Sequence, residues 1–434
     1  MKQAKKWLIL SHAFNMDGRA ASLTVTDKIP HLLRHGITPI VVSSVAGDKD
    51  SRFEHFQLLP WGPSGLRFDF RHWFAKKYQR RGLYKVVTGL VGLLLLPFIA
   101  LERLVIGLSS HSSWSLPAFI KGYLLFRQGK IDLIYSTGGA WSAHFAGWML
   151  KKTTGLPWIV EIHDPMVIRT DPSDDGFNPR SNRDKRFLQK LEGLICKDAD
   201  HIWWFTEGAI AYAKLRNPSL GSKGFVLMPG AEPPLLTGEH AYTNQLHLVH
   251  FGSLANDRSL APIIHALHDL LETEPALRDR VVIDVYGAPL DEASVRAMSD
   301  LTMQNYVKVW GRLEADEMTG LSGRGRVMKK MHEADILLLL HGDYEWCAEY
   351  IPSKWYDYLW SGRPIFAITN RNPSFDDLLI ARNSYMAKTL DHASIVRCLK
   401  DICNDWESKN LKRAVGNPIG VNDAVAKILG EVYK

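Results

Sequence analysis

The sequence has little cysteine and no apolar stretch that would serve as a cleavable signal. Its four cysteines, Cys196, Cys347, Cys398 and Cys403, do not pair at the spacing of a metal or redox motif. Such scattered thiols are typical of buried, reduced side chains, which argues against a disulfide scaffold. The apolar run at residues 7–10 is too short for a signal core and instead predicts a strand. We therefore expect a cytoplasmic protein.

A large excess of either charge is also missing. Hydrophobic residues make up 46% of the chain and charged residues 23%, a balance that excludes disordered and fibrous classes. The formal charge of +7 favours anionic partners such as phosphates, lipid head groups or nucleic acid, without choosing among them. At 434 residues the chain is long enough for two domains.

Short apolar runs alternate with helix-length amphipathic stretches, a pattern typical of parallel sheets with crossover helices. A helix is predicted from Ala21 to His35, closed by Gly36. Two such series predict an α/β fold of two doubly wound, Rossmann-like domains that face each other across a ligand-binding cleft. The predicted strands are 7–10, 38–44, 131–137, 157–163, 201–206, 224–229, 246–252, 281–287, 306–311, 335–340 and 364–369.

The domain boundary is predicted between residues 229 and 240, where prolines and glycines interrupt regular structure. This gives an N-terminal domain at 1–235 and a C-terminal domain at 240–434. The last helix, at 422–433, could return to the first domain.

One insertion interrupts the alternation. Residues 71–85 carry six Lys or Arg and no acid, and the next 23 residues contain only Glu102 and Arg103 as charges. A single membrane crossing would separate strands that should share a sheet, and Pro97 should break a straight helix. We therefore predict that 71–108 lies in the interface of an anionic membrane. A buried helical hairpin and a transmembrane span are the alternatives.

The segment from Glu349 to Pro364, "EYIPSKWYDYLWSGRP", contains a predicted anion site. Ser353 is expected to cap a helix that opens at Lys354 and ends at Gly362. The amides at the helix start, together with Lys354, would bind a phosphate, while Glu349 and Asp357 would bind sugar hydroxyls. This combination suits a nucleotide sugar. An ordinary surface helix start is the alternative.

Glu349 and Asp357 have the spacing of the E-x7-E motif of retaining GT-B glycosyltransferases of the family-four type, with aspartate as the second acid. The segment "VHFGSLANDRSLAPIIHALHDLL" resembles the strand, loop and helix that open the donor domain of that family. The segment "IDLIYSTGGAWSAHFAGWMLKKTTGLPWIVEIHDP" resembles the acceptor domain of lipopolysaccharide and capsule glycosyltransferases. The resemblance covers about four-fifths of the chain and is strongest in 246–368.

The resemblance implies a role for each matching residue. Glu349 would contact the transferred sugar, Asp357 the ribose and Arg258 the diphosphate, while Gly311 and Arg312 would lie near the base. The catalytic residues so implied are His163, Asp164 and Glu349. The donor-binding residues are Gly18, Arg258, Gly311, Arg312, Glu349, Tyr350, Ile351, Pro352, Ser353, Lys354 and Asp357.

Two departures from the family pattern bear on the diphosphate. Ser253 follows Gly252 where the family often has arginine, so binding would depend on Arg258 and Lys354. The first loop, with Gly18, has one glycine rather than two. The D-x-D sequences at 48–50 and 198–200 do not follow a strand as a metal site requires. We therefore expect no essential metal or other cofactor, and expect the cations to neutralise the diphosphate.

The predicted function is transfer of a sugar from a nucleoside-diphosphate sugar to a lipid-linked or membrane-proximal glycan acceptor. The resemblance implies a retaining enzyme of bacterial surface polysaccharide synthesis, peripheral on the inner face of the cell membrane. The alternatives are a sugar-nucleotide epimerase and a non-catalytic protein that binds membranes or nucleic acid. A nucleic-acid partner is not expected, because the chain has no recognisable reader motif.

Overall fold

The computed structural model describes residues 5–16, 19–78, 81–169, 181–234, 240, 242–255, 257–316 and 318–434. The chain divides into two compact units. The first contains Met1–Ile168, Phe177–Pro229 and Val421–Lys434, and the second is formed mainly by Gly230–Gly420.

In the described part of the first unit, seven parallel strands form a sheet in the order β3-β2-β1-β4-β5-β6-β7. Side chains that alternate along the strands enter two separate cores, one on each face. The strands are β1 (Lys5–Leu10), β2 (Ile37–Ser44), β3 (Glu54–Leu58), β4 (Leu133–Gly138), β5 (Trp158–Ile162), β6 (His201–Trp204) and β7 (Gly224–Val226).

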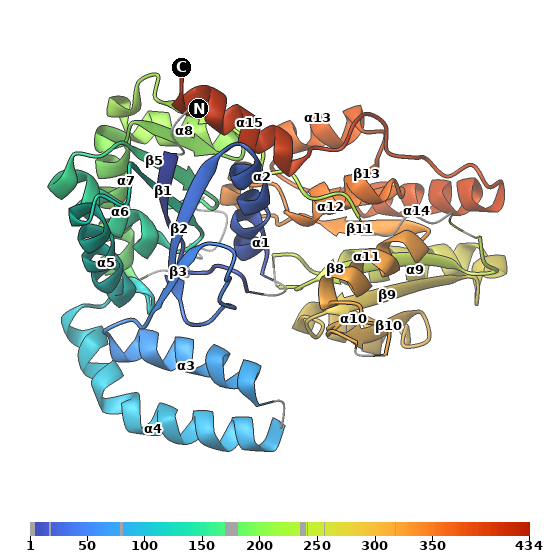
Figure 1. Cartoon of the computed structure of the whole chain (residues 1–434). Helices are drawn as coiled ribbons and strands as arrows, with labels where there is room; N and C mark the ends of the chain where they lie inside the picture. Colours follow the sequence, from blue (N-terminus) through green and yellow to red (C-terminus); the bar gives the residue numbers. More distant parts are fainter. Residues whose placement is uncertain are drawn as a thin grey trace. The chain divides into compact units, whose positions relative to one another are not determined.

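Helices cover both faces of this sheet (Figure 1). On one face lie α1 (Ala20–Thr26), α2 (Lys28–Arg34) and α15 (Val421–Val432). The other face carries α5 (Ser115–Arg127), α6 (Trp141–Thr154), α7 (Asn182–Asp198) and α8 (Glu207–Arg216). The C-terminal helix α15 therefore belongs to the first unit, where Val425 and Ile428 pack in the same core as Ile29 and Leu32 of α2.

The described part of the second unit contains six parallel strands in the order β10-β9-β8-β11-β12-β13. The strands are β8 (Leu246–Gly252), β9 (Val281–Gly287), β10 (Val307–Gly311), β11 (Ile336–Leu340), β12 (Ile365–Thr369) and β13 (Tyr385–Lys388). One face packs on α9 (Ala261–Thr273), α10 (Glu292–Asp300) and α14 (His392–Glu407). The remaining helices are α11 (Gly323–Glu333), α12 (Lys354–Ser361) and α13 (Pro373–Ala381). Short 3-10 turns occur at Ser112–Trp114, Pro218–Leu220, Pro275–Leu277 and Glu345–Glu349.

Both strand orders are those of a doubly wound sheet, so the predicted fold class is confirmed. The helix predicted from Ala21 to His35 is instead two helices, α1 and α2, that meet at Asp27. Pro30 explains the break, because it has no N–H to donate to the carbonyl of Thr26. The structure also adds two strands that were not predicted, β3 and β13.

The insertion forms a hairpin of two helices, α3 (Pro63–Lys77) and α4 (Arg81–Val105), that extends from the first unit (Figure 1). The prediction that Pro97 breaks the second helix is wrong, since α4 continues through it. Of the helices in the described ranges, this one alone is long and apolar enough to cross a membrane, with a mean hydropathy of 2.0. Only 17% of the most apolar stretch of α4 is buried, so α4 is not a core helix.

Candidate functional site

The switch point of the second sheet lies between β8 and β11, and both β8 and its other neighbour β9 end in a glycine. Gly252 and Gly287 close these strands with φ angles of +107° and +132°, a region that favours glycine. A Cβ atom on Gly287 would lie 2.3 Å from the carbonyl oxygen of Gly252. Ligands of doubly wound folds bind outside the carboxyl ends of the strands, at the switch point beside β8.

Lys354 brings a cation to this point. Its Nζ donates a hydrogen bond of 2.6 Å to the carbonyl of Phe251 and would lie 3.3 Å from a Cβ on Gly252. Burial, and then the nearby charge of Arg258, lower the pKa of Lys354 to about 7. An anion bound here would favour the protonated amine and would raise that pKa again.

Arg258 lies in the loop after β8, where its backbone pairs with Ala255. Its Nε lies 3.7 Å from Asp257, and the side chain is 35% exposed. The same charge also contributes to lowering the pKa of His341, after burial. The structure therefore brings the predicted residues Arg258 and Lys354 together at the end of β8.

The loop after β11 carries the predicted acid Glu349, which is 2% exposed and ends a 3-10 turn. The ring of Tyr350 stacks on His341 with a centroid distance of 4.7 Å. Asn372 donates hydrogen bonds of 3.0 Å to the carbonyls of Cys347 and Tyr350 and thereby ties the loop to the end of β12. Asn372 and His341 were not predicted, because neither belongs to a recognisable motif.

The start of α12 differs from the prediction. Ser353 precedes the helix but already has helical φ and ψ angles, and its side chain makes no capping hydrogen bond. The amides of Trp355 and Tyr356 donate to the carbonyls of Pro352 and Ser353. These two amides are therefore engaged within the turn, which leaves Lys354 as the better-placed anion-binding group. Gly362 ends the helix in the left-handed conformation as predicted.

The other predicted donor-site residues lie on neighbouring elements. Ile351 is half-buried and Pro352 is buried ahead of α12. Asp357 lies one turn inside that helix, 3.9 Å from Arg324 of α11. Gly311 ends β10 with a φ angle of +74° and has open space where a Cβ would be, and Arg312 lies 3.6 Å from Glu314.

Three aromatic rings follow the strand ends from β8 to β10, a feature that was not predicted. Phe251 stacks on Tyr286 at 5.4 Å, and Tyr286 stacks on Trp310 at 6.2 Å. Trp310 is 58% exposed and donates to Asp284 through its indole nitrogen. Phe251 and Tyr286 are buried, so of the three rings only that of Trp310 offers an aromatic surface to a ligand.

In the first unit, the predicted His163 follows β5 and contacts a buried carboxylate. Its Nε2 lies 2.8 Å from Glu161 and 3.1 Å from Thr137 Oγ1. Glu161 is fully buried and also accepts hydrogen bonds from Lys28, Tyr135 and Trp203.

Burial alone would raise the pKa of Glu161, but Lys28 and His163 outweigh it and hold the pKa well below its usual range. The ionised carboxylate therefore fixes the imidazole with Nε2–H as the donor. The buried Lys28–Glu161 pair joins residues 133 positions apart and was not predicted.

Asp164 is exposed beside the end of β4, where its Oδ2 would lie 3.0 Å from a Cβ on Gly139. His163 and Asp164 therefore both lie at the carboxyl edge of the first sheet. Gly18 lies outside the described residues.

Three aspartates of the two D-x-D sequences form ion pairs with basic side chains. Asp50 pairs with Arg52, Asp198 with Lys152, and Asp200 with Lys151. Within the residues that the structure describes, no three His, Cys, Asp or Glu side chains are grouped as ligands for a metal ion.

No protein-family model and no curated protein sequence matches the chain. Solved structures do. TarM shares 9% identity, with a TM-score of 0.61 and 99% of both chains covered. HepE from Anabaena, in complex with UDP, shares 12% identity, with a TM-score of 0.56 and 99% of both chains covered. A UDP-N-acetylglucosamine 2-epimerase from Listeria monocytogenes shares 10%, with a TM-score of 0.55 and 98% and 95% coverage. At this identity the likeness identifies the GT-B fold.

Proposed function

We propose that this protein is a glycosyltransferase that moves a sugar from a nucleoside-diphosphate sugar to a lipid-linked or membrane-proximal glycan acceptor. The observation that carries the proposal is the pair of cations, Lys354 and Arg258, beside the bare backbone of Gly252 at the switch point of the second sheet. The GT-B fold that the chain shares with HepE supports it. Because that structure contains UDP, UDP-sugars are the first donors to test.

In the proposed donor complex, Lys354 and Arg258 bind the diphosphate without a metal and stabilise it as it leaves. Glu349 contacts the transferred sugar, and Asp357 binds the ribose hydroxyls. Gly311 and Arg312 adjoin the base, for which the exposed ring of Trp310 offers a stacking surface.

In the proposed reaction, the bond from the anomeric carbon to the diphosphate breaks, a bond to the acceptor hydroxyl forms, and the hydroxyl proton is released. His163 and Asp164 would lie at the acceptor side. Glu161 would keep the imidazole of His163 oriented through its Nε2–H. The E-x7-E-like pair, Glu349 and Asp357, favours retention of the anomeric configuration.

We further propose a peripheral location on the cytoplasmic face of the cell membrane, in the synthesis of a bacterial surface polysaccharide. The α3–α4 hairpin supports this location. The strands before and after it, β3 and β4, belong to one sheet, so the insertion leaves and re-enters the domain on the same side of a bilayer. Its second helix exposes most of its apolar surface.

Three substitutions test the donor site, each with UDP binding and sugar transfer as separate measurements. Glu349→Ala should abolish turnover while UDP still binds, because its partner is the sugar. Asp357→Ala should weaken UDP binding about ten- to a hundredfold, the value of a charge-assisted hydrogen bond. Arg258→Ala should reduce both. Arg278→Ala, an exposed cation near the amino end of β9, is the matched control.

A sugar-nucleotide epimerase is the second candidate, because the Listeria epimerase has the same fold. An epimerase would convert a UDP-sugar without any acceptor, whereas a transferase releases UDP in proportion to glycosylated product. Conversion of the donor to an isomer in the absence of acceptor would replace our proposal with this one.

A further inference from the structure

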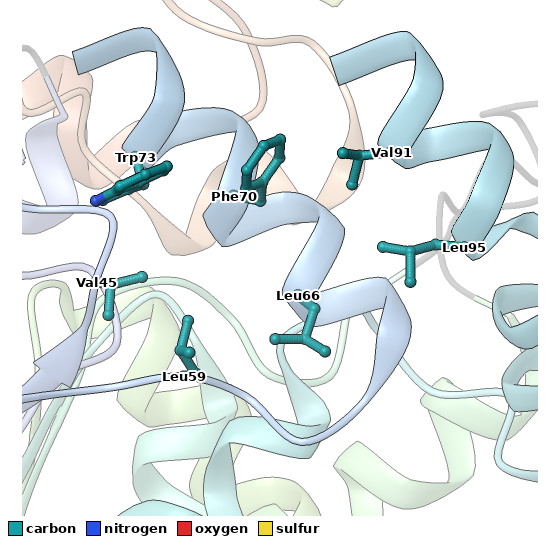
Figure 2. A pocket seen from close by; sticks show the side chains of 7 residues that line it. All are labelled: Val45, Leu59, Leu66, Phe70, Trp73, Val91 and Leu95. Atoms are coloured by element: carbon teal, nitrogen blue, oxygen red, sulfur yellow. The ribbon is translucent and has the colours of Figure 1, made fainter. Parts of the chain in front are cut away.

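An apolar pocket of about 420 Å³ opens between the α3–α4 hairpin and the body of the first unit (Figure 2). Val45 and Leu59, which follow β2 and β3, form one wall. The hairpin forms the rest, and every lining side chain is hydrophobic. The volume lies within the range of small-molecule sites, roughly 300–1,000 Å³.

The two helices direct regularly spaced side chains into this space. Leu66, Phe70 and Trp73 of α3 follow an i, i+4, i+7 spacing, and Val91 and Leu95 of α4 follow i, i+4. Figure 2 shows Val91 and Leu95 directed from α4 toward α3, with Val45 and Leu59 below α3. The rim is open, because Leu59 is 53% exposed and Trp73 is 39% exposed.

The rest of α4, away from Val91 and Leu95, exposes a large apolar surface. Leu93, Leu94, Leu101 and Leu104 are between 58% and 73% exposed. Exposed basic residues, among them Arg71, Lys77, Lys85 and Arg103, accompany it. Such a surface matches an anionic bilayer. One helix therefore offers its outer face to lipid and its inner face to the pocket.

Polar groups adjoin the pocket on the side toward the centre of the sheet. Asp69, on α3, is fully buried, and burial raises its pKa to about 7. His12, which follows β1, lies 3.7 Å from it. Polar groups at the ends of β1 and β5 thus lie along the same carboxyl edge of the sheet as the apolar pocket.

This arrangement fits an amphiphile whose length can be estimated. Neighbouring strands lie about 4.8 Å apart, so the three intervals from β2 to β5 place the pocket roughly 14 Å from His163. A diphosphate with one sugar could bridge that distance. A methylene group is similar in size to a water molecule, which occupies about 30 Å³ in the liquid, so the pocket would hold roughly a dozen methylene groups.

We propose that this pocket binds the hydrocarbon chain of the lipid-linked acceptor and so directs its head group along the sheet edge toward His163. The inference deepens the proposed function and rests on it for the identity of the lipid. The alternative is that hydrocarbon chains bind only to the outer face of α4, as the chains of bilayer phospholipids would, and not in the pocket.

The test uses butyl, octyl and dodecyl phosphate below their micelle concentrations as probes, with calorimetric binding to the full chain. Each methylene that enters the pocket should improve affinity about fourfold, so octyl phosphate, with four more methylenes, should bind roughly 250-fold more tightly than butyl phosphate. Leu95→Trp, which fills the pocket, should reduce dodecyl phosphate binding at least tenfold. Leu94→Trp, on the exposed face of the same helix, is the matched control and should not.

Binding to phosphatidylglycerol vesicles and binding to UDP are measured as well, to distinguish a defect in the pocket from a defect in membrane binding or in the donor site. Leu95→Trp should leave both unchanged, and an unchanged circular dichroism spectrum would show that the variant is folded. The pocket proposal is overturned if affinity does not depend on chain length, or if Leu95→Trp and Leu94→Trp act alike on dodecyl phosphate. If dodecyl phosphate binds as expected but no sugar transfer occurs, the pocket stands and the proposed function falls.

Discussion

The lowered pKa of Lys354 makes a quantitative prediction about nucleotide binding. With a pKa of about 7, the free lysine is roughly 10% protonated at pH 8. Because a diphosphate requires the cation, its binding should raise the pKa and take up about 0.9 proton from solvent at that pH. His250 and His341 do not interfere, because burial lowers the pKa of both and leaves them neutral at pH 8.

The assay is calorimetric titration with UDP at pH 8 in two buffers of different ionisation enthalpy. Affinity should fall about 50-fold between pH 7 and pH 9 as the free lysine loses its proton. Lys354→Arg should bind UDP without proton uptake and without this pH dependence, since guanidinium remains charged. UDP binding with no proton uptake in the wild-type protein would refute the reasoning.

Lys354→Met separates a binding role from a structural one. It should weaken UDP binding roughly ten- to a hundredfold. The pKa of Lys354 in the folded protein lies below the value near 10.4 in the unfolded chain, so the unfolded chain binds more protons between pH 7 and pH 10. Burial of this lysine therefore lowers the free energy of unfolding at pH 7, and that loss is recovered as the pH rises. The methionine variant should therefore unfold at no lower urea concentration than the wild type at pH 7. A variant that loses both stability and binding would indicate a structural lysine.

Three further predictions concern the scaffold. Lys28→Met leaves the buried carboxylate of Glu161 without its ion-pair partner and should cost about 3–5 kcal/mol in urea unfolding, whereas Lys130→Met, from an exposed pair, should cost at most about 1 kcal/mol. Gly287→Ala places a methyl group against backbone in a left-handed region and should cost about 1–3 kcal/mol, with weaker UDP binding. The protein should sediment with anionic vesicles, less so at 1 M salt, where the Debye length falls to about 3 Å, and Leu104→Glu should weaken that binding further.

The fold was largely predictable because both sheets are parallel. Their central strands are buried on both faces and appear as apolar runs, such as "ILLLL" in β11. The two missed strands, β3 with "EHFQL" and β13 with "YMAK", are edge strands of the two sheets and contain polar residues. An edge strand needs only one partner, so its sequence carries a weaker signal.

The site was predictable where one short segment carries the chemistry. The stretch around Lys354 combines a lysine, two acids and a helix start, and Arg258 was inferred from the family resemblance. The error at Ser353 has a local cause, since helical dihedral angles at that residue turn its side chain away from the amides it should cap. No local pattern, by contrast, predicts that Lys28 and Glu161 meet, because buried lysines are rare and this pair is made by tertiary packing.

One property of the α3–α4 hairpin was predicted from the sequence and another was not. Its composition predicted contact with a membrane, but composition cannot separate the inner face of α4 from the outer one. Only the packing of α4 on α3 shows that Val91 and Leu95 face a pocket while Leu94 and Leu104 remain exposed. The same apolar helix can therefore serve two purposes, attachment to the bilayer and selection of the acceptor, and the paired variants at residues 94 and 95 distinguish them because adjacent helical positions point in different directions.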